Sequence, residues 1–191
     1  VREQVGIRMV GDYGLSRNNM TIFQAPGLAD AQPHGPGIQI WQCNDEAPSF
    51  IGPMDTDDRW FFAPTGIAPD AVFSEEDVLG MIRRSTGLDL PYKILSNEIW
   101  TIHRLLAERY SSGRVFLTGD ACHLHPPFGG FGMNMGICDS VDLGWKLAAT
   151  VQGWGDSALL DTYEMERRPI HHYVLDEAEA NHSLAPNQLA R

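Results

Sequence analysis

The sequence predicts a mixed α+β fold, on two observations. The first part of the chain contains short runs of β-branched and aromatic residues separated by Gly, Pro, Asp and Asn, as in an antiparallel sheet. The second part places a short apolar run before a glycine-rich loop and long stretches of helical periodicity. A length of 191 residues, 43% of them apolar, is enough to bury a sizeable core.

Strand and helix signals follow one another through the first hundred residues. The predicted strands are residues 20–24, 38–43, 49–52 and 59–63, with a further extended segment at residues 94–102. Between them, Ser74 and Asp77 approximate a capping box, and Gly87 supplies a stop, so this stretch is predicted to be a helix. The apolar stripe of this helix consists of Val78, Met81 and Ile82.

The helix predicted at about residues 133–152 carries a row of small residues. Its members, spaced four apart, are Gly132, Gly136, Ser140, Gly144 and Ala148. Such a row lets another backbone approach closely. We expect core packing at Gly144 and Ala148. Close approach to a ligand is equally open for Gly132 and Gly136, which lie near the start of the helix.

Two further elements complete the second part. Residues 115–118 form an apolar run and are predicted to be a buried strand. Asp156 or Ser157 is expected to cap a last helix. Pro169 is expected to divide this helix, because proline removes an interior hydrogen bond. From Asn181 onward the chain is expected to fray.

Charge and cysteine content exclude several classes of partner. A formal net charge of -11 argues against nucleic acid or an anionic membrane surface, although local amides can still bind a phosphate-bearing cofactor. No apolar run approaches the ~20 residues that a membrane span needs. Three widely spaced cysteines imply no disulfide framework, so we expect a reduced, cytoplasmic protein.

An acidic residue follows the predicted strand at residues 115–118. Asp120 comes directly after Gly119, at the carboxyl end of that strand. Ligands of open α/β sheets gather at this end, and a carboxylate there can accept hydrogen bonds from ribose or ribityl hydroxyls. The alternative is an acidic turn that only caps the following loop.

The loop at residues 129–132 is richer in glycine than a simple turn requires. Glycine lets the backbone lie flat against a planar ligand, and Pro126 and Pro127 stiffen the entry to the loop. The helix predicted to begin near Met133 would direct free N–H groups and a partial positive charge at whatever lies in front of it. This arrangement suits an anion or a ring oxygen on which negative charge develops.

Other polar side chains offer weaker candidates. Cys122, His123 and His125 contain zinc-ligand chemistry, but their spacing is poor, so we expect loop structure and no metal. His171 and His172 are expected to lie on a solvated helix face.

Aromatic residues of the β-rich part could line a pocket for an aromatic ligand. They are Trp41, Trp60, Phe61 and Phe62. The alternative is that these side chains belong to the core, which is the more frequent place for an aromatic residue on a strand.

Four motifs follow one another through the second part of the chain. They are Gly113-Arg114-Val115-x-Leu117-x-Gly119-Asp120-Ala121-x-His123, Pro126-Pro127-x-Gly129-Gly130-x-Gly132-x-Asn134, Asp139 with Leu143-x-Trp145-Lys146-Leu147, and Leu160-x-x-Tyr163-x-x-Glu166-Arg167-Arg168-Pro169. In this order they resemble the motifs of the FAD-dependent aromatic hydroxylases of the p-hydroxybenzoate hydroxylase type, and especially the phenol and polyketide hydroxylase branch of that family. The match is dense over residues 107–170 and looser over residues 20–62.

The resemblance implies roles for individual residues. Asp120 would bind the ribityl chain of FAD, and the glycine loop would lie along the flavin ring, near where a C4a-hydroperoxide forms. The implied cofactor-binding residues are Gly119, Asp120, Pro126, Gly130, Gly132, Met133 and Asn134. The implied catalytic positions are Pro126, Gly129 and Gly130. Trp41, Trp60 and Phe62 are the candidates for contact with substrate.

One departure from the family pattern is large. The family opens with a Gly-x-Gly-x-x-Gly turn for the adenosine half of the cofactor, and this fingerprint does not occur in the chain. Val1 and Arg2 resemble the end of a second family motif. We therefore expect a C-terminal fragment, with residues 1–10 ending the first portion of the FAD domain, residues 11–105 forming a β-rich substrate domain, and residues 106–191 completing the FAD domain.

The function that the resemblance implies is hydroxylation of a phenolic or polycyclic aromatic substrate with FAD, NAD(P)H and molecular oxygen. The fragment alone is expected to be inactive and to bind FAD weakly or not at all. Assembly as a homodimer stays open. The alternatives are a truncated module that binds an aromatic ligand without catalysis, and a flavin oxidase or dehydrogenase that uses the same site.

Overall fold

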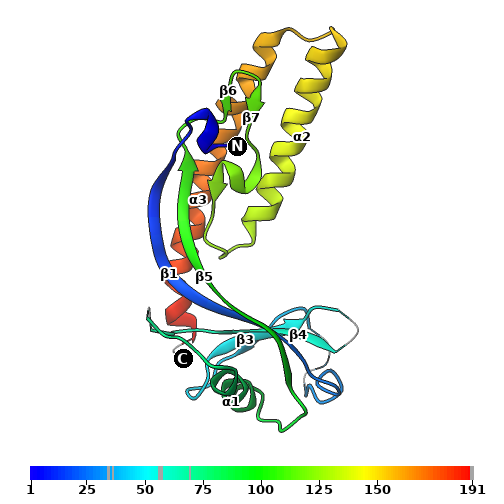
Figure 1. Cartoon of the computed structure of the whole chain (residues 1–191), viewed down its shortest axis with the longest axis vertical. Helices are drawn as coiled ribbons and strands as arrows, with labels where there is room; N and C mark the ends of the chain where they lie inside the picture. Colours follow the sequence, from blue (N-terminus) through cyan, green and yellow to red (C-terminus); the bar gives the residue numbers. More distant parts are fainter. Residues whose placement is uncertain (34, 36, 56–57, 69, 190–191) are drawn as a thin grey trace. The chain divides into compact units, whose positions relative to one another are not determined.

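The computed structural model describes residues 1–33, 35, 37–55, 58–68 and 70–189, with the backbone alone at residues 185–189. It has the mixed α+β fold that the sequence predicts (Figure 1). The helices are α1 (Glu75–Thr86), α2 (Phe131–Gln152) and α3 (Thr162–Leu189), with 3-10 turns η1 (Glu3–Val5), η2 (Gly119–Ala121) and η3 (Ser157–Asp161). The strands are β1 (Met9–Gln24), β2 (Ile40–Gln42), β3 (Ser49–Pro53), β4 (Arg59–Pro64), β5 (Lys93–Ala107), β6 (Ser111–Ser112), β7 (Val115–Phe116) and β8 (His123–Leu124).

The chain divides into two compact units. We call residues 1–15 and 102–185 the helical unit, and residues 16–101 with the end of the chain the sheet unit. One sheet, in the order β2-β3-β4-β1-β5-β8, contributes strands to both units because β1 and β5 are long. A separate two-stranded sheet pairs β6 with β7.

The sheet unit packs α1 against one face of its strands. Antiparallel register places Ile51 opposite Phe62 and Phe23 opposite Trp60, so these apolar side chains gather under the helix. Helix α1 supplies Val78 and Ile82, both with 0% of their surface exposed. The capping box of Ser74 with Asp77 and the left-handed Gly87 at the end are both present, as the sequence predicts.

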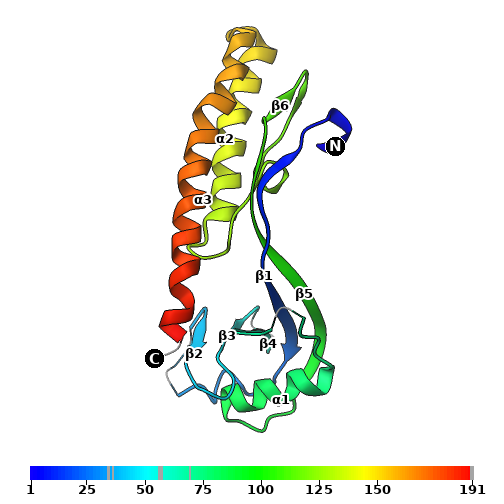
Figure 2. The ribbon, with the colours of Figure 1, turned by 90° about the vertical axis from the view of Figure 1, so that its left-hand side faces the viewer.

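The helical unit places α2 and α3 side by side, which both views show (Figures 1 and 2). Its apolar core is formed by β5, the β6–β7 hairpin and the two helices, with Tyr110 and Tyr163 fully buried at its centre. An ion pair also joins the helices, since the buried Lys146 amino group of α2 lies 2.7 Å from Glu166 of α3, and it lies 2.8 Å from Asp142 on its own helix. The described helices include none that is long and apolar enough to cross a membrane.

Helix α3 is longer than predicted and is one continuous helix. It runs through Pro169 without interruption, so the predicted division is wrong. The backbone is helical to Leu189, and the end of the tail that was expected to fray lies outside the described residues. Proline at position 169 removes the partner of the carbonyl of Met165, which is 73% exposed. Water can satisfy this carbonyl, so the proline is tolerated. Asp156 does act as a cap, but for η3.

Two other local predictions are also corrected. The strand expected at residues 115–118 is reduced to β7, and its continuation is held by a hydrogen bond from Leu117 N–H to the Tyr110 carbonyl and by the Tyr163 hydroxyl, which donates to the Leu117 carbonyl at 2.7 Å. Gly144 and Ala148 do not pack in a core. Both are exposed, and a Cβ on Gly144 would meet no atom within 4 Å.

Candidate functional site

The candidate cofactor site is built on the segment that links η2, β8 and α2, in the helical unit. Helix α2 begins at Phe131, about two residues earlier than predicted, and its N-cap is Gly130 in the left-handed region with φ +66°. No side chain caps this end, and no acidic residue lies in the first turn. The first-turn N–H groups of Phe131, Gly132 and Met133 therefore lack an intrahelical acceptor and are available to a ligand.

The free backbone amides at the start of α2 lie one residue earlier than predicted. Phe131 joins Gly132 and Met133, while Asn134 lies in the second part of the turn, where its side-chain amide donates to the Gly130 carbonyl at 2.9 Å. Asn134 thus fixes the N-cap itself. Its predicted contact with the cofactor remains a prediction.

The glycine loop leaves open space in front of this helix end. Gly129 and Gly130 are exposed, and a Cβ on Gly130 would meet no atom within 4 Å. Gly129 has φ +111°, and a Cβ there would lie 2.3 Å from the Phe131 ring, so glycine is required. Pro126 is buried at the entry to the loop, and Phe128 stacks on His182 of α3 with ring centroids 4.8 Å apart.

Asp120 lies at the surface in η2. Its side chain is exposed, and within the described parts of the chain no hydrogen bond to its carboxylate occurs. Turn η2 packs against α2, where Gly119 Cα and Gly136 approach so closely that a Cβ on Gly136 would lie 3.3 Å from Gly119 Cα. An unpaired acceptor, open glycines and an uncapped helix end fit a ligand that combines hydroxyl groups with a ring carrying negative charge.

Next to η2 lies a buried carboxylate that the sequence analysis placed in a family motif but to which it assigned no role. Asp139 of α2 has 0% exposure. Its Oδ2 accepts from Gly119 N–H at 3.1 Å and from His123 Nε2 at 2.7 Å. Its Oδ1 lies 2.8 Å from Arg167 Nε and 3.0 Å from His171 Nε2. We call Asp139, His123, Arg167, His171 and Tyr110 the Asp139 cluster.

Hydrogen bonds set the protonation states of the cluster. Burial acts to raise the pKa of Asp139, but hydrogen bonds from His123, His171 and Arg167 outweigh it and hold that pKa far below its ordinary range. The Tyr110 hydroxyl lies 2.5 Å from His171 Nδ1. Burial raises the pKa of Tyr110 and lowers that of His171, so a neutral imidazole accepts from the tyrosine and donates to the carboxylate.

Two predictions about histidines are wrong in part, although His172 is exposed as predicted. His171 was expected on a solvated face, but it has 0% exposure and faces Asp139. Of Cys122, His123 and His125, which were expected in a loop, only His123 departs from the prediction, because it begins β8 and pairs with Leu106 of β5. The spacing of Arg167 and His171, four residues apart on one helix face, was the available sequence signal for the cluster.

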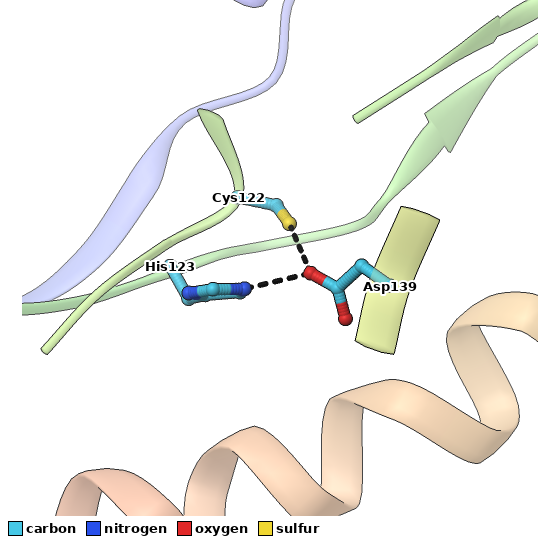
Figure 3. Close-up of side chains that lie close together, drawn as sticks. All are labelled: Cys122, His123 and Asp139. Carbon is cyan, nitrogen blue, oxygen red and sulfur yellow. Dashed lines mark hydrogen bonds and ion pairs between the residues drawn. The ribbon is translucent and has the colours of Figure 1, made fainter. Parts of the chain in front are cut away.

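Cys122, His123 and Asp139 bring a thiol, an imidazole and a carboxylate within 4.8 Å of one another. Figure 3 shows that the first two side chains point at the same carboxylate oxygen. A cation there would lie close to the Arg167 guanidinium, and burial raises the pKa of the Cys122 thiol, which disfavours the thiolate that binds metal. The arrangement is that of a hydrogen-bonded cluster.

The predicted substrate residues fall on two faces of the sheet unit. Trp60 and Phe62 lie in the core under α1, with 4% and 0% exposure. Trp41 is 44% exposed and contacts Phe50, with ring centroids 5.4 Å apart, and Phe50 contacts Phe61 at 6.2 Å. Of the three predicted residues, Trp41 is therefore the one that a ligand can reach without repacking the core.

A surface depression of about 710 Å³ lies elsewhere in the helical unit. Its lining includes Ser111, Glu164, Arg168 and His172 and none of the predicted site residues. Glu164 is already occupied, since it accepts from Tyr110 N–H at 2.9 Å. Because no predicted cofactor residue borders the depression, we do not include it in the candidate cofactor site.

Comparisons with known proteins identify the family to which the chain belongs. A family model described as FAD binding domain matches residues 1–178. The chain is 39% identical over 201 residues to tetracenomycin A2 monooxygenase-dioxygenase of Streptomyces glaucescens, covering 96% of this chain and 35% of that protein. It is 56% identical over 79 residues to rifampicin monooxygenase of Rhodococcus hoagii, covering 41% of this chain and 16% of that protein.

Solved structures show the same similarity. The crystal structure of aklavinone-11 hydroxylase with FAD and aklavinone superposes with a TM-score of 0.84 at 32% identity, over 95% of this chain and 35% of that chain. The rebeccamycin biosynthetic enzyme RebC with reduced flavin gives a TM-score of 0.82 at 34% identity, over 93% of this chain and 34% of that chain.

The chain belongs to the FAD-binding family of flavoprotein monooxygenases. It spans about a third of the length of the tetracenomycin, aklavinone and rebeccamycin relatives.

Proposed function

We propose that this chain is the part of a FAD-dependent aromatic monooxygenase that holds the ribityl and ring side of the flavin and one face of the substrate. The observation that carries the proposal is the uncapped start of α2 behind two exposed glycines, beside an exposed and unpaired Asp120. These features lie in one family-matched segment.

Each residue has a defined task in this proposal. Asp120 accepts hydrogen bonds from ribityl hydroxyls. The backbone of Gly129 and Gly130 lies against the ring, with Pro126 and the stack of Phe128 on His182 fixing the loop. The N–H groups of Phe131, Gly132 and Met133 stabilise negative charge on a ring oxygen, an effect on the order of 0.3–2 kcal/mol. FAD, when bound, supplies oxygen activation and transfer of one oxygen atom to the substrate, with NAD(P)H as reductant.

The proposed substrate is a phenolic or polycyclic aromatic compound. Relatives named as polyketide hydroxylases, and a relative solved with aklavinone, support this class. In the sheet unit, Trp41, Phe50 and Phe61 form a continuous aromatic face on the side of the sheet away from α1, and such a face suits a flat ring. Residues 11–105 remain the proposed substrate domain and residues 106–191 the proposed cofactor portion.

We expect the chain alone to bind FAD weakly. Micromolar affinity requires about -8 kcal/mol, and the residues found here meet only the ribityl and ring part of the cofactor. Titration of purified protein with FAD, followed by flavin fluorescence, measures this. A stoichiometric yellow chromophore retained through purification would contradict the expectation.

Complementation tests the proposed activity. The chain is co-expressed with the dinucleotide-binding part of a family member, and NADPH oxidation and hydroxylated product are measured. Asp120→Ala should lower FAD affinity at least about tenfold, because a carboxylate hydrogen bond is lost, whereas Asp161→Ala, at an exposed position away from α2's first turn, should not. Hydrogen peroxide without hydroxylated product would favour an oxidase.

The aromatic face of the sheet unit favours a second candidate, a module that binds an aromatic ligand without catalysis. Ligand binding by the chain, with no flavin-dependent activity after complementation, would support this candidate. Loss of ligand binding in Trp41→Ala, with binding kept in the exposed control Trp154→Ala, would place the ligand on this face.

A further inference from the structure

We propose that Asp139 and Gly136 are positioning residues that fix the η2 turn, and hence Asp120, against helix α2. The inference rests on the proposed function of Asp120 as the residue that holds the ribityl chain. It assigns a task to two residues that do not themselves lie at the surface of the cofactor site. Four observations carry it.

The first observation is the connectivity of Asp139. Its two oxygens accept from a backbone amide in η2, a histidine in β8, and an arginine and a histidine in α3. These four donors use the acceptor capacity of a carboxylate. A buried charged cluster is weak evidence for stability alone, since apolar packing of similar volume often serves as well. A geometric task is the better explanation.

The second observation is the contact between two glycines. Gly119 has φ +57°, and a Cβ on it would lie 3.7 Å from Gly136 Cα. A Cβ on Gly136 would lie 3.3 Å from Gly119 Cα, which is tighter than ordinary contact. Gly136 and Asp139 are three residues apart, on one face of α2. The same face therefore contacts Gly119 twice, once at Cα and once at N–H.

The third observation is the short path from Gly119 to Asp120. Turn η2 is closed by Cys122 N–H, which donates to the Gly119 carbonyl at 2.9 Å. A displacement of Gly119 therefore moves the turn that carries Asp120. Misplacement of a binding group by about 1 Å can change a rate by about 100-fold.

The fourth observation is that the carboxylate itself is held firmly. His171 is fixed by the Tyr110 hydroxyl at 2.5 Å, and Tyr110 N–H donates to Glu164. His123 is fixed by the pairing of β8 with β5. Asp139 thus fixes η2 relative to β8 and α3, and through β8 relative to β5.

Gly136→Ala is the sharpest test, with Gly144→Ala as its matched control. Both replace a glycine of α2 by a better helix former, but only the first inserts a methyl group against Gly119, because Gly144 faces open space. In ¹H–¹⁵N NMR spectra of the chain, the Gly119 and Asp120 amide resonances should move in Gly136→Ala and stay in Gly144→Ala. Unmoved resonances in Gly136→Ala would overturn the proposal.

Asp139→Asn is a second test, of the hydrogen bond between Gly119 N–H and the Asp139 carboxylate. The Gly119 amide proton should lose the downfield shift that a carboxylate acceptor gives, with helical content retained by circular dichroism. If this variant does not fold, Gly136→Ala decides the question by itself, since it leaves the Asp139 cluster intact.

Flavin titration links the turn to the proposed function. Gly136→Ala should weaken FAD binding at least tenfold and Gly144→Ala less than twofold. Equal affinities in all three proteins, with moved Gly119 and Asp120 resonances, would overturn the positioning role. These titrations use the chain co-expressed with the dinucleotide-binding part of a family member. If the wild-type complex binds neither FAD nor riboflavin, the result counts against the proposed function, and the NMR spectra of the variants then decide whether Gly136 contacts η2.

Discussion

The two units of this chain bury very different groups. The core of the sheet unit is apolar and aromatic, with Phe23, Ile51, Phe62, Val78 and Ile82 all at 0% exposure. The helical unit buries charge as well, since Asp139 and Lys146 are fully buried and Arg167 nearly so. An apolar core depends mainly on volume and tolerates repacking. A buried charged cluster requires each partner, since one missing donor leaves a charge unpaired.

This difference matches the proposed tasks of the two units, which are substrate binding for the sheet unit and cofactor binding for the helical unit. A sheet unit that presents an aromatic face needs a stable support under it, and α1 provides this through nondirectional packing. A helical unit that holds a cofactor needs fixed directions at Gly119 and Gly130, and hydrogen bonds and helix ends are directional. Two substitutions and a change of pH test this difference between the two cores, and they follow from the largest expected effect to the smallest.

Removing the arginine of the cluster should have the largest effect. Arg167→Leu leaves the Asp139 carboxylate buried without its cationic partner, which is expected to destabilise the helical unit by about 3–5 kcal/mol. Hydrogen exchange followed by mass spectrometry should show lost protection over residues 102–185 and unchanged protection over residues 16–101. The control Arg83→Leu removes the exposed pair with Asp89 and should change stability by less than about 1 kcal/mol.

A comparable change in the apolar core should be milder. Phe62→Leu keeps an apolar side chain at a fully buried position, so we expect a loss of about 1–2 kcal/mol in the sheet unit. Urea unfolding monitored by fluorescence of the buried Trp60 measures this unit. A loss as large as that of Arg167→Leu would contradict the proposed difference between the two cores.

Acid should destabilise the helical unit alone. Burial, together with the neighbouring His123 and His171, lowers the pKa of His125 to about 3, against 6.5 for an unperturbed histidine. The unfolded chain therefore binds more protons between these values, and stability falls as pH falls below 6.5. From pH 7.5 to 5.5 we expect a loss of about 1 kcal/mol.

His125→Asn removes one of the two histidines whose pKa burial lowers, His171 being the other, and is the control for the contribution of His125. Its unfolding free energy should change less between pH 7.5 and 5.5 than that of the wild type. Asp139 acts at lower pH, since its depressed pKa gives stability that is present above the unfolded value of 3.8 and lost below it. An equal pH dependence in the sheet unit would count against the assignment.

Much of the fold could be predicted from local signals. Ser74 with Asp77 and Gly87 fixed the ends of α1, because capping is decided within one turn of chain. The strands of the sheet unit followed from runs of β-branched and aromatic residues between turn residues. The open glycine loop before α2 and the acidic turn at Asp120 were also visible in the sequence, because both depend on residue types at fixed spacing.

The tertiary structure alone decided what each polar and aromatic residue faces. Asp139, His123 and His171 are far apart in sequence, and only the packing of α2, β8 and α3 brings their atoms within hydrogen-bond distance. Likewise, Trp41 and Phe62 both lie in predicted strands, but the register of β2, β3 and β4 places one on an open face and the other under α1. The sequence by itself determined the local backbone and the cofactor motif, because short-range sterics and capping govern these. Which charges are buried together, and which aromatic face stays open, depends on long-range packing that no local pattern encodes.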